Sequence, residues 1–234
     1  DNTTLTVTSS MAGTKADGTQ QTAGVTFDAS GLTSNRVLKF TGADANDVVS
    51  GGAGNDVIST GAGVDTITGG AGVDTFVIAS SADAGANEEY TDFVEGAAGD
   101  VFSLTQANIV AGGATISDGA TVVSVDTSDV GTTASDGTDV LLFTSAHAST
   151  AALLTAAAGA SGVVEGTDGD FDAASVMAIF VDNDGTDAGT YLVALTGAAD
   201  YSATGWASAT IVAELGSTTL AEVSDLTADN FTIA

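Results

Sequence analysis

Residues 42–77 read GADANDVVS, GGAGNDVIS, TGAGVDTIT and GGAGVDTFV, which are four consecutive units of nine residues. Each unit joins a glycine-rich stretch to an aspartate, and an apolar side chain follows the aspartate by two positions. The aspartates are Asp47, Asp56, Asp65 and Asp74, and the apolar residues are Val49, Ile58, Ile67 and Phe76. A repeat of this length and composition predicts short strands separated by tight turns, with one coil stacked on the next.

The two halves of the unit predict two different tasks. Glycine imposes little steric restriction, so the Gly-Gly-Ala-Gly stretch can turn sharply and point its carbonyl groups inward. Calcium takes six to eight oxygen ligands at roughly 2.3–2.6 Å, and both backbone carbonyls and carboxylates serve. The second half is a short strand whose apolar residue faces the axis of the stack, and Phe40 begins this inward row nine residues before Val49. We therefore expect calcium in the turns and an apolar core between the strands.

These units resemble the repeats of the RTX family of calcium-binding proteins that are exported by type I secretion. The resemblance implies a mainly β fold, a right-handed parallel β-roll or β-helix in which two units make one coil. Asp47 would then lie over Asp65 on one edge, and Asp56 over Asp74 on the other. It also implies at least two calcium ions, one on each edge between stacked turns. Because close carboxylates disfavour mutual ionisation, we expect the roll to form with calcium and to loosen without it.

The resemblance also gives a set of candidate calcium ligands. Carboxylate, amide or backbone oxygens would come from Asp44, Asp47, Gly51, Ala53, Asn55, Asp56, Gly61, Ala62, Asp65 and Asp74. The first unit has Asp44 and Ala45 where glycine is expected, and the third unit begins with Thr60. These departures affect the outermost ligands and leave the register intact.

Two further groups of acids are weaker candidates. Asp92 and Asp100 lie in a segment whose Asp-Phe pair and Gly-Asp-x-Phe-x-Leu strand resemble the close of an RTX roll, where acidic residues can hold a last calcium. Asp182 and Asp184 lie in a loop that predicts a hairpin turn, and its oxygen spacing also suits calcium, as does that of residues 168–172. Ordinary solvated loop acids are the alternative in each case.

The charge of the chain restricts its partners. The 234 residues include 31 acidic and only 3 basic side chains, which gives a formal charge of −28, and no base follows residue 39. Nucleic acid and anionic membranes are therefore excluded as electrostatic partners, because nothing neutralises phosphate. No apolar run approaches the ~20 residues needed to span a bilayer. Cysteine is absent, so calcium is the expected staple of an extracellular fold, and the absence of proline suits long β-ladders.

The chain divides by pattern into four parts. Residues 1–40 are expected to form strands that extend or cap the roll, residues 41–77 the roll, and residues 78–104 a cap over its exposed end. Residues 105–234 predict a β-rich region with strands near 121–125, 139–143, 174–181, 190–195 and 210–215, and one short alanine-rich helix near 148–158. The segment 226–234 resembles an uncleaved type I secretion signal, in which a short apolar strand follows acidic residues.

Catalytic patterns are missing from the sequence. His147 is the only histidine, there is no Gly-x-Ser-x-Gly elbow, and zinc peptidase motifs need two histidines. Paired carboxylates of the glycosidase kind cannot be judged in so acidic a chain, but Trp206 is the only tryptophan available for stacking on sugars. We therefore expect a protein that is not an enzyme.

Three functions fit these observations. The favoured one is a calcium-dependent structural protein that self-assembles in a bacterial surface layer or extracellular filament, with cell-surface polysaccharide as a further candidate partner. The second is the C-terminal secretion and folding module of a larger RTX exoprotein. The third is a calcium-stiffened adhesin domain. All three place the chain outside the cell, exported by type I secretion.

Overall fold

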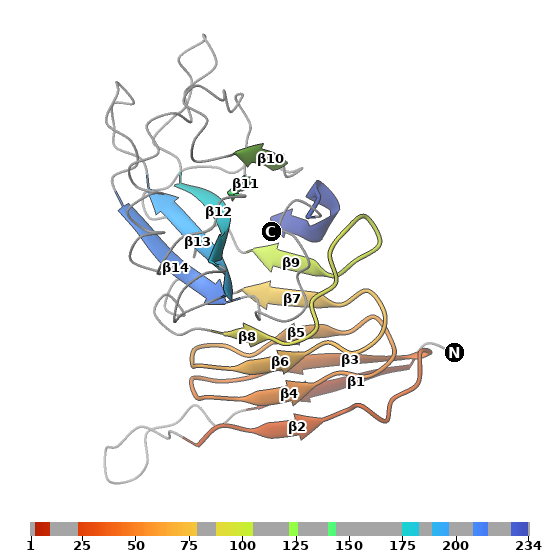
Figure 1. The fold of residues 1–234 in the computed structure, drawn as a ribbon. Helices are drawn as coiled ribbons and strands as arrows, with labels where there is room; N and C mark the ends of the chain where they lie inside the picture. The colour runs from red at the N-terminus through yellow and green to blue at the C-terminus, as the bar shows by residue number, and fades with distance from the viewer. Residues whose placement is uncertain are drawn as a thin grey trace, which may run out of the picture.

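The protein is built from two β-sheets, seen in a computed structural model (Figure 1). The structure describes residues 3–9, 23–78, 88–104, 122–125, 140–143, 175–182, 189–196, 208–214 and 226–233. Within these residues the only helical element is one 3-10 turn, and all other regular structure is strand. The predicted helix near 148–158 lies outside the described residues.

The first sheet has six strands, and every neighbouring pair in it is parallel. In spatial order these are β1 (Thr3–Thr8), β3 (Arg36–Thr41), β5 (Val57–Ser59), β7 (Thr75–Ile78), β9 (Val101–Leu104) and β15 (Phe231–Ile233). The second sheet begins with four parallel strands, β2 (Thr26–Asp28), β4 (Val48–Ser50), β6 (Thr66–Thr68) and β8 (Glu89–Tyr90). Strands of the two sheets alternate along the chain from β1 to β9, so that this part winds as a parallel β-roll.

The predicted coil of two repeat units is confirmed by the register. Ile58 in β5 lies opposite Phe76 in β7, and Val49 in β4 lies opposite Ile67 in β6. Each partner is 18 residues further along the chain, which is twice the nine-residue period. Successive repeats therefore alternate between the two sheets, and the turns that join them form the two edges of the roll.

The core of the roll is the row of apolar side chains predicted from the repeat. Phe40, Val49, Ile58, Ile67 and Phe76 are each at most 2% exposed. Burying side chains of this size is worth about 1.5–3 kcal/mol each, so this row gives the stack much of its cohesion.

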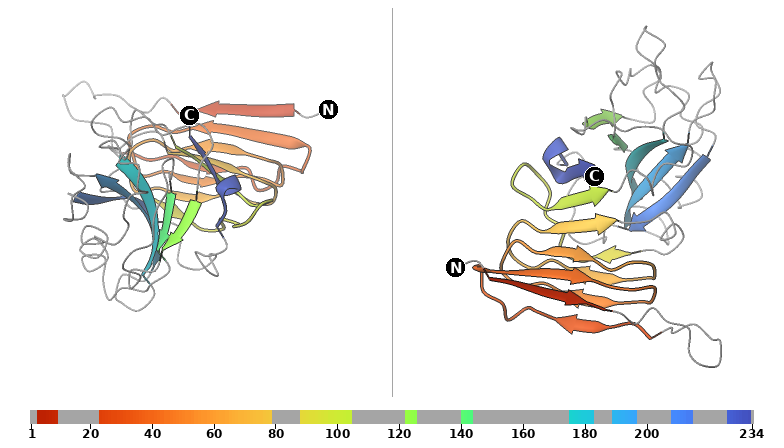
Figure 2. Two further views of the ribbon diagram at one scale, coloured as in Figure 1. Left: turned by 90° about the horizontal axis from the view of Figure 1, so that it is seen from above. Right: turned by 180° about the vertical axis from the view of Figure 1, so that it is seen from behind.

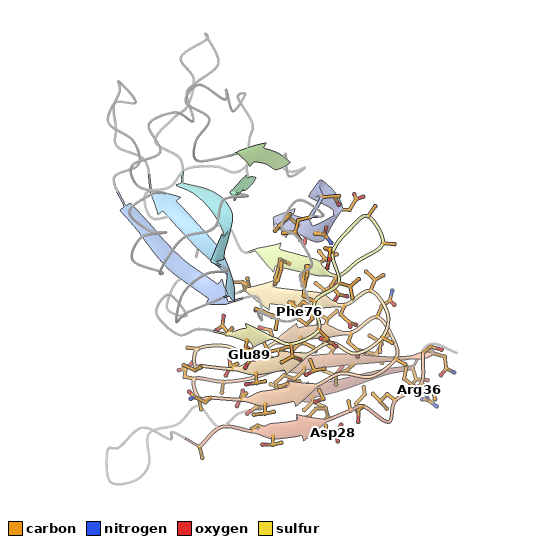
Figure 3. All side chains as sticks on the ribbon, viewed as in Figure 1. Asp28, Arg36, Phe76 and Glu89 are labelled. Atoms are coloured by element: carbon orange, nitrogen blue, oxygen red, sulfur yellow. The ribbon has the colours of Figure 1, made fainter. Side chains whose placement is uncertain are left out.

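Aromatic rings close the end of the roll above Phe76, which Figure 3 labels between the two sheets. The centroid of the Phe76 ring lies 5.0 Å from that of Tyr90, 6.0 Å from that of Phe93 and 6.0 Å from that of Phe102. Phe93 and Phe102 stack on each other at 4.3 Å. Residues 88–104 thus cover the apolar end that the last repeat would otherwise expose.

The end of the chain returns to the roll and adds a strand to it. The 3-10 turn η3 (Ala228–Asn230) leads into β15, which pairs in parallel with β9 so that Phe231 lies opposite Phe102. Leu226 and Phe231 join the buried core, each 3% exposed. Figure 2 shows this strand beside β9 in two further views. The sequence suggested a secretion signal here and gave no sign that the segment would complete the sheet.

The remaining strands extend the second sheet beyond β8. Their order is β14 (Ser208–Glu214), β13 (Gly189–Thr196), β12 (Ser175–Asp182), β11 (Val140–Phe143) and β10 (Val122–Val125). β12 and β13 pair antiparallel from Ser175 opposite Thr196 to Asp182 opposite Gly189, so the predicted hairpin is confirmed. The five strands expected in the C-terminal region are all present, although β14 begins two residues before the predicted start.

Candidate calcium site

The repeat aspartates lie in two columns, one on each edge of the roll. Strand register places Asp47, Asp65 and Glu88 in one column, the first carboxylate ladder, because each directly precedes one of the paired strands β4, β6 and β8. Asp56, Asp74 and Asp100 form the second carboxylate ladder, because they directly precede β5, β7 and β9. All six side chains are at most 2% exposed.

Hydrogen bonds join each aspartate to the coil before it. Oδ1 of Asp65 accepts the backbone N–H of Asp47 at 2.7 Å, and Oδ1 of Asp74 accepts that of Asp56 at 2.8 Å. The predicted stacking of Asp47 with Asp65 and of Asp56 with Asp74 is therefore confirmed. Asp100 continues the second ladder, since its Oδ1 accepts the N–H of Asp74 at 2.8 Å. One carboxylate oxygen of each residue is thus fixed, and the other is aimed within the turn.

That other oxygen has no protein partner in three of the aspartates. Among the residues that the structure describes, Oδ2 of Asp47, Asp65 and Asp74 is buried without a hydrogen bond. An ionised oxygen buried in this way is costly unless a counter-charge or a cation meets it. A cation bound beside any of these three oxygen atoms would therefore lower the free energy of the folded roll.

Burial raises the pKa of three of the aspartates in the two ladders, Asp65, Asp74 and Asp100. Burial raises the pKa of Asp74 to about 7, and the neighbouring charges of Asp100, Asp56 and Asp92 add to the effect. Burial also raises the pKa of Asp65, with a further contribution from the charge of Asp47. Cations favour ionised carboxylates, so binding of calcium would release these protons.

Backbone carbonyls of one turn face glycines of the next turn. On the edge of the first ladder, a Cβ on Gly61 would lie 2.9 Å from the carbonyl oxygen of Ala43, and one on Gly63 would lie 2.7 Å from that of Ala45. Gly61 has φ +90° and Gly63 φ +155°, which are values that favour glycine. The carbonyls of one turn thus approach the glycines of the next turn closely.

The second edge repeats this arrangement one unit later. A Cβ on Gly72 would lie 2.6 Å from the carbonyl oxygen of Gly54, and one on Gly70 would meet that of Gly52. Gly70 has φ +103° and Gly72 φ +128°. Glycine is therefore required on both edges for the same reason, the close approach of successive turns.

Calcium fits the donors that these turns present. Each edge offers buried carboxylates and several main-chain carbonyls, all hard oxygen ligands, and no imidazole or thiolate. No cluster of three or more His, Cys, Asp or Glu side chains occurs in the described part of the chain, so main-chain oxygens would complete the coordination. Asp47 and Asp65 would hold an ion on one edge, and Asp56 and Asp74 on the other.

The predicted carbonyl ligands remain a prediction, and two of the carbonyls nearest an adjacent turn already accept a backbone N–H, that of Ala43 from Ala45 and that of Gly52 from Ala71, each at 2.9 Å. The sequence suggested Gly51, Ala53, Gly61 and Ala62, and nothing in the structure tests whether these bind calcium. The carbonyls that face an adjacent turn belong to Ala43, Ala45, Gly52 and Gly54. Because a turn alternates the direction of its carbonyls, the choice between neighbours depends on backbone geometry that the repeat pattern does not reveal.

Four other predicted ligands make protein contacts through their side-chain oxygens. Asp56 accepts the N–H of Leu38 through Oδ1 at 2.7 Å and that of Gly52 through Oδ2 at 2.6 Å. Asn55 accepts the N–H of Val73 through Oδ1 at 3.1 Å and so joins two coils. Asp92 accepts the N–H groups of Gly69 and Gly70, each at 2.7 Å. Asp100 uses its second oxygen to accept the N–H of Val94 at 2.8 Å.

For the remaining predicted ligands the structure shows only their position in the chain or their exposure. Asp44 is exposed on its turn. Asp182 ends β12, while Asp184 and residues 168–172 lie outside the described residues.

Sequence reasoning missed two residues that the structure brings to the roll. Glu88 occupies the aspartate position of the first ladder in the coil after Asp65, but residues 79–87 break the nine-residue spacing that would have identified it. Asn230 is fully buried: its Nδ2 donates to the carbonyls of Gly96 and Asp100, and its Oδ1 accepts the N–H of Gly96 at 3.0 Å. A local sequence pattern cannot predict these contacts of Asn230, because its partners lie 130 residues or more away in the sequence.

Comparison with known proteins agrees with this geometry. The structure defines a parallel β-roll with tight, glycine-rich turns. Residues 41–76 match the RTX calcium-binding nonapeptide repeat in four copies, so this segment belongs to the RTX repeat family. No curated protein and no solved structure matched the chain. The family match supports an exported, calcium-binding protein, and none of the described helices is long and apolar enough to cross a membrane.

Proposed function

We propose that the chain is a structural protein that calcium orders outside the cell and that then self-associates in a bacterial surface layer or extracellular filament. The observation that carries the proposal is the pair of carboxylate ladders, in which Asp47, Asp65 and Asp74 bury an oxygen without a protein partner. A roll built in this way depends on a cation for its cohesion. Calcium is accordingly a structural ligand here and supplies no chemistry.

The calcium concentration would determine where the chain folds. Extracellular calcium modules bind at about 10⁻⁴–10⁻³ M, far above the cytosolic level that high-affinity buffers control. The chain would remain loose in the cytosol, pass through a type I secretion system unfolded, and form the roll outside. Because the chain has no cysteine, calcium takes the part that disulfides play in many secreted proteins.

Composition supports a structural and non-catalytic role. The sequence has one histidine, no cysteine and no recognisable nucleophile motif. A formal charge of −28 keeps separate copies apart in the absence of cations. Divalent cations, which screen and bridge carboxylates, would therefore permit association as well as folding.

The test is a calcium titration of protein stripped with chelator, followed by far-UV circular dichroism and light scattering together. The proposal expects β-structure to appear first and particles much larger than the chain to follow as calcium rises. Folding without large particles would contradict self-assembly and favour a secretion and folding module. Large particles with no gain of β-structure would contradict the calcium-ordered roll itself.

A further inference from the structure

The two ends of the roll are finished differently. The C-terminal end is closed by Leu226, Asn230 and Phe231, all at most 3% exposed. The N-terminal end begins with β1, where Leu5 lies opposite buried Leu38. Leu5 therefore belongs to the inward row of side chains, yet it is 43% exposed because no coil covers it among the described residues.

Two more inward side chains are incompletely covered at the same end. Val7 lies opposite Phe40, and Phe27 lies opposite Val49, both partners being part of the buried core. Val7 and Phe27 are only partly buried, and the Phe27 ring packs on Phe40 at 5.5 Å. Within the described residues, the apolar interior is thus uncovered where β1 and β2 begin the stack, a surface that we call the open end, formed by Leu5, Val7 and Phe27.

The free edge of β1 also presents backbone hydrogen-bonding groups that could pair with another strand. The N–H of Thr3 donates to Asn35 and that of Ser9 to Thr41, so odd-numbered residues of this strand bond to β3. The backbone groups of Thr4, Thr6 and Thr8 therefore point to the free edge. Edge strands usually carry charges, proline or bulges that prevent pairing with another chain, whereas β1 has none of these.

Charge distinguishes the start of the sequence from the rest. Residues 1–40 contain three acids and three bases, so their formal charge is zero, and the charged residues among them that the structure describes are Asp28, Arg36 and Lys39. The other 28 acids, 31 less 3, lie in residues 41–234 with no base. Arg36 and Lys39 are exposed on β3, next to β1, and Figure 3 labels Arg36 at this end of the roll. The described part of this end thus lacks the excess of acids that opposes contact between copies elsewhere.

We propose that the open end binds the open end of a second copy, with the two β1 strands paired antiparallel about a two-fold axis. A two-fold contact brings the same residues together from both copies. Leu5, Val7 and Phe27 of each copy would then cover those of the other, and the outward groups of Thr4, Thr6 and Thr8 would complete a continuous sheet. The occupant is a second copy because, within the described residues, the open end of that copy offers the same apolar side chains beside the same unpaired strand edge, with no excess of acids. The inference rests on the proposed function only in that both require self-association.

Sedimentation in saturating calcium tests the interface on the full chain. The wild-type protein should form a species of twice the 22.6 kDa of the chain before any larger particle. Thr6→Pro removes an outward N–H and leaves the bonds from β1 to β3 in place, so it should raise the dissociation constant of the dimer at least tenfold. Thr6→Val keeps the N–H and should match the wild type. Far-UV circular dichroism checks that both variants still fold with calcium.

Leu5→Lys provides a second variant if the proline disturbs the strand. The lysine charge is solvated in the monomer, where residue 5 is exposed, but it would have to be buried in the dimer contact. The dimer should therefore be lost while the calcium-induced fold remains. Dimers of Thr6→Pro and Leu5→Lys that are as stable as the wild type would overturn the inference.

Cross-linking locates the contact directly, because the chain has no cysteine of its own. Thr4→Cys, Thr6→Cys and Thr8→Cys, made singly, should yield at least one variant that forms a disulfide-linked dimer on oxidation in calcium. Thr232→Cys, exposed on β15 at the opposite edge of the same sheet, is the matched control and should not. Equal cross-linking at Thr232, or none in β1, would refute the two-fold contact. If large particles form without the β1 dimer, the two-fold contact is refuted and the proposed function is unaffected. If a cross-linked dimer forms but grows no further, only the surface-layer or filament role is contradicted.

Discussion

Asp65 lies one coil beyond Asp47, and its Oδ1 accepts the backbone N–H of Asp47 at 2.7 Å. The same carboxylate therefore holds two coils together through one oxygen and leaves the other, Oδ2, buried without a partner. Stacking of the chain brings like charges into neighbouring positions, which opposes folding until a cation arrives. Under the proposed function, folding and calcium binding are consequently one equilibrium.

Removing the charge of one ladder residue should weaken calcium-induced folding. Asp65→Asn keeps an oxygen that can accept the N–H of Asp47 but loses the negative charge. We expect the calcium midpoint of folding, measured by far-UV circular dichroism, to rise about tenfold or more, which corresponds to about 1.4 kcal/mol. Asp28→Asn is the control, because Asp28 is exposed and its hydrogen bonds are made locally, with the backbone N–H and the side chain of Ser30. Similar midpoints for the two variants would refute the assignment of the first ladder.

The calcium-free protein should become less stable as pH rises. The pKa of Asp74 is raised from 3.8 to about 7 in the fold, so between these values the folded chain binds a proton that the unfolded chain has lost. That stabilisation is complete below pH about 4 and is lost as pH rises through about 7. Burial raises the pKa of Asp65 and of Asp100 in the same direction.

Thermal unfolding of calcium-stripped protein at pH 5 and pH 8 measures this effect. We expect the higher midpoint at pH 5, and a smaller difference between the two pH values in Asp74→Asn, which has no proton to lose. Saturating calcium should abolish or reverse the trend because it favours the ionised form. Greater stability of the stripped protein at pH 8 would show that the buried carboxylates do not govern it.

A side chain in the turn should obstruct the stacking of coils. Gly72 has φ +128°, and its Cβ would lie 2.6 Å from the carbonyl oxygen of Gly54. Backbone strain of this kind costs about 1–3 kcal/mol, so Gly72→Ala should lower the free energy of unfolding in calcium by at least that amount. Gly31→Ala is the matched control, since a Cβ there would meet no atom within 4 Å. Denaturant unfolding compares the two, and equal stability would argue against close contact of the turns.

The end of the chain should stabilise the roll from a distance. Asn230 donates to the carbonyls of Gly96 and Asp100, 134 and 130 residues earlier. Asn230→Ala leaves these buried groups without a partner, which costs about 1–3 kcal/mol. We expect that loss in denaturant unfolding with saturating calcium, while Thr232→Ala, at an exposed site in the same segment, should change little. An unchanged free energy of unfolding in Asn230→Ala would mean that the packing of β15 on the roll does not depend on this residue.

Local periodicity explains how much the sequence could predict. The nine-residue spacing was sufficient for the parallel roll, the inward row from Phe40 to Phe76 and the stacking of Asp47 with Asp65, because each depends on residues one coil apart. Glu88 escaped prediction because the insertion before it interrupts the period. Asn230 and Phe231 escaped because their partners lie more than a hundred residues away, and loop closure over that distance leaves no trace in a short window of sequence.

We propose that calcium lies between stacked turns of the roll. The most direct measurement is the anomalous difference density of a crystal grown with calcium. The account predicts one peak between turns 42–47 and 60–65, beside Asp47 and Asp65, and another between turns 51–56 and 69–74, beside Asp56 and Asp74. A well-ordered roll with no peak in either gap, at a calcium concentration that saturates folding, would contradict it.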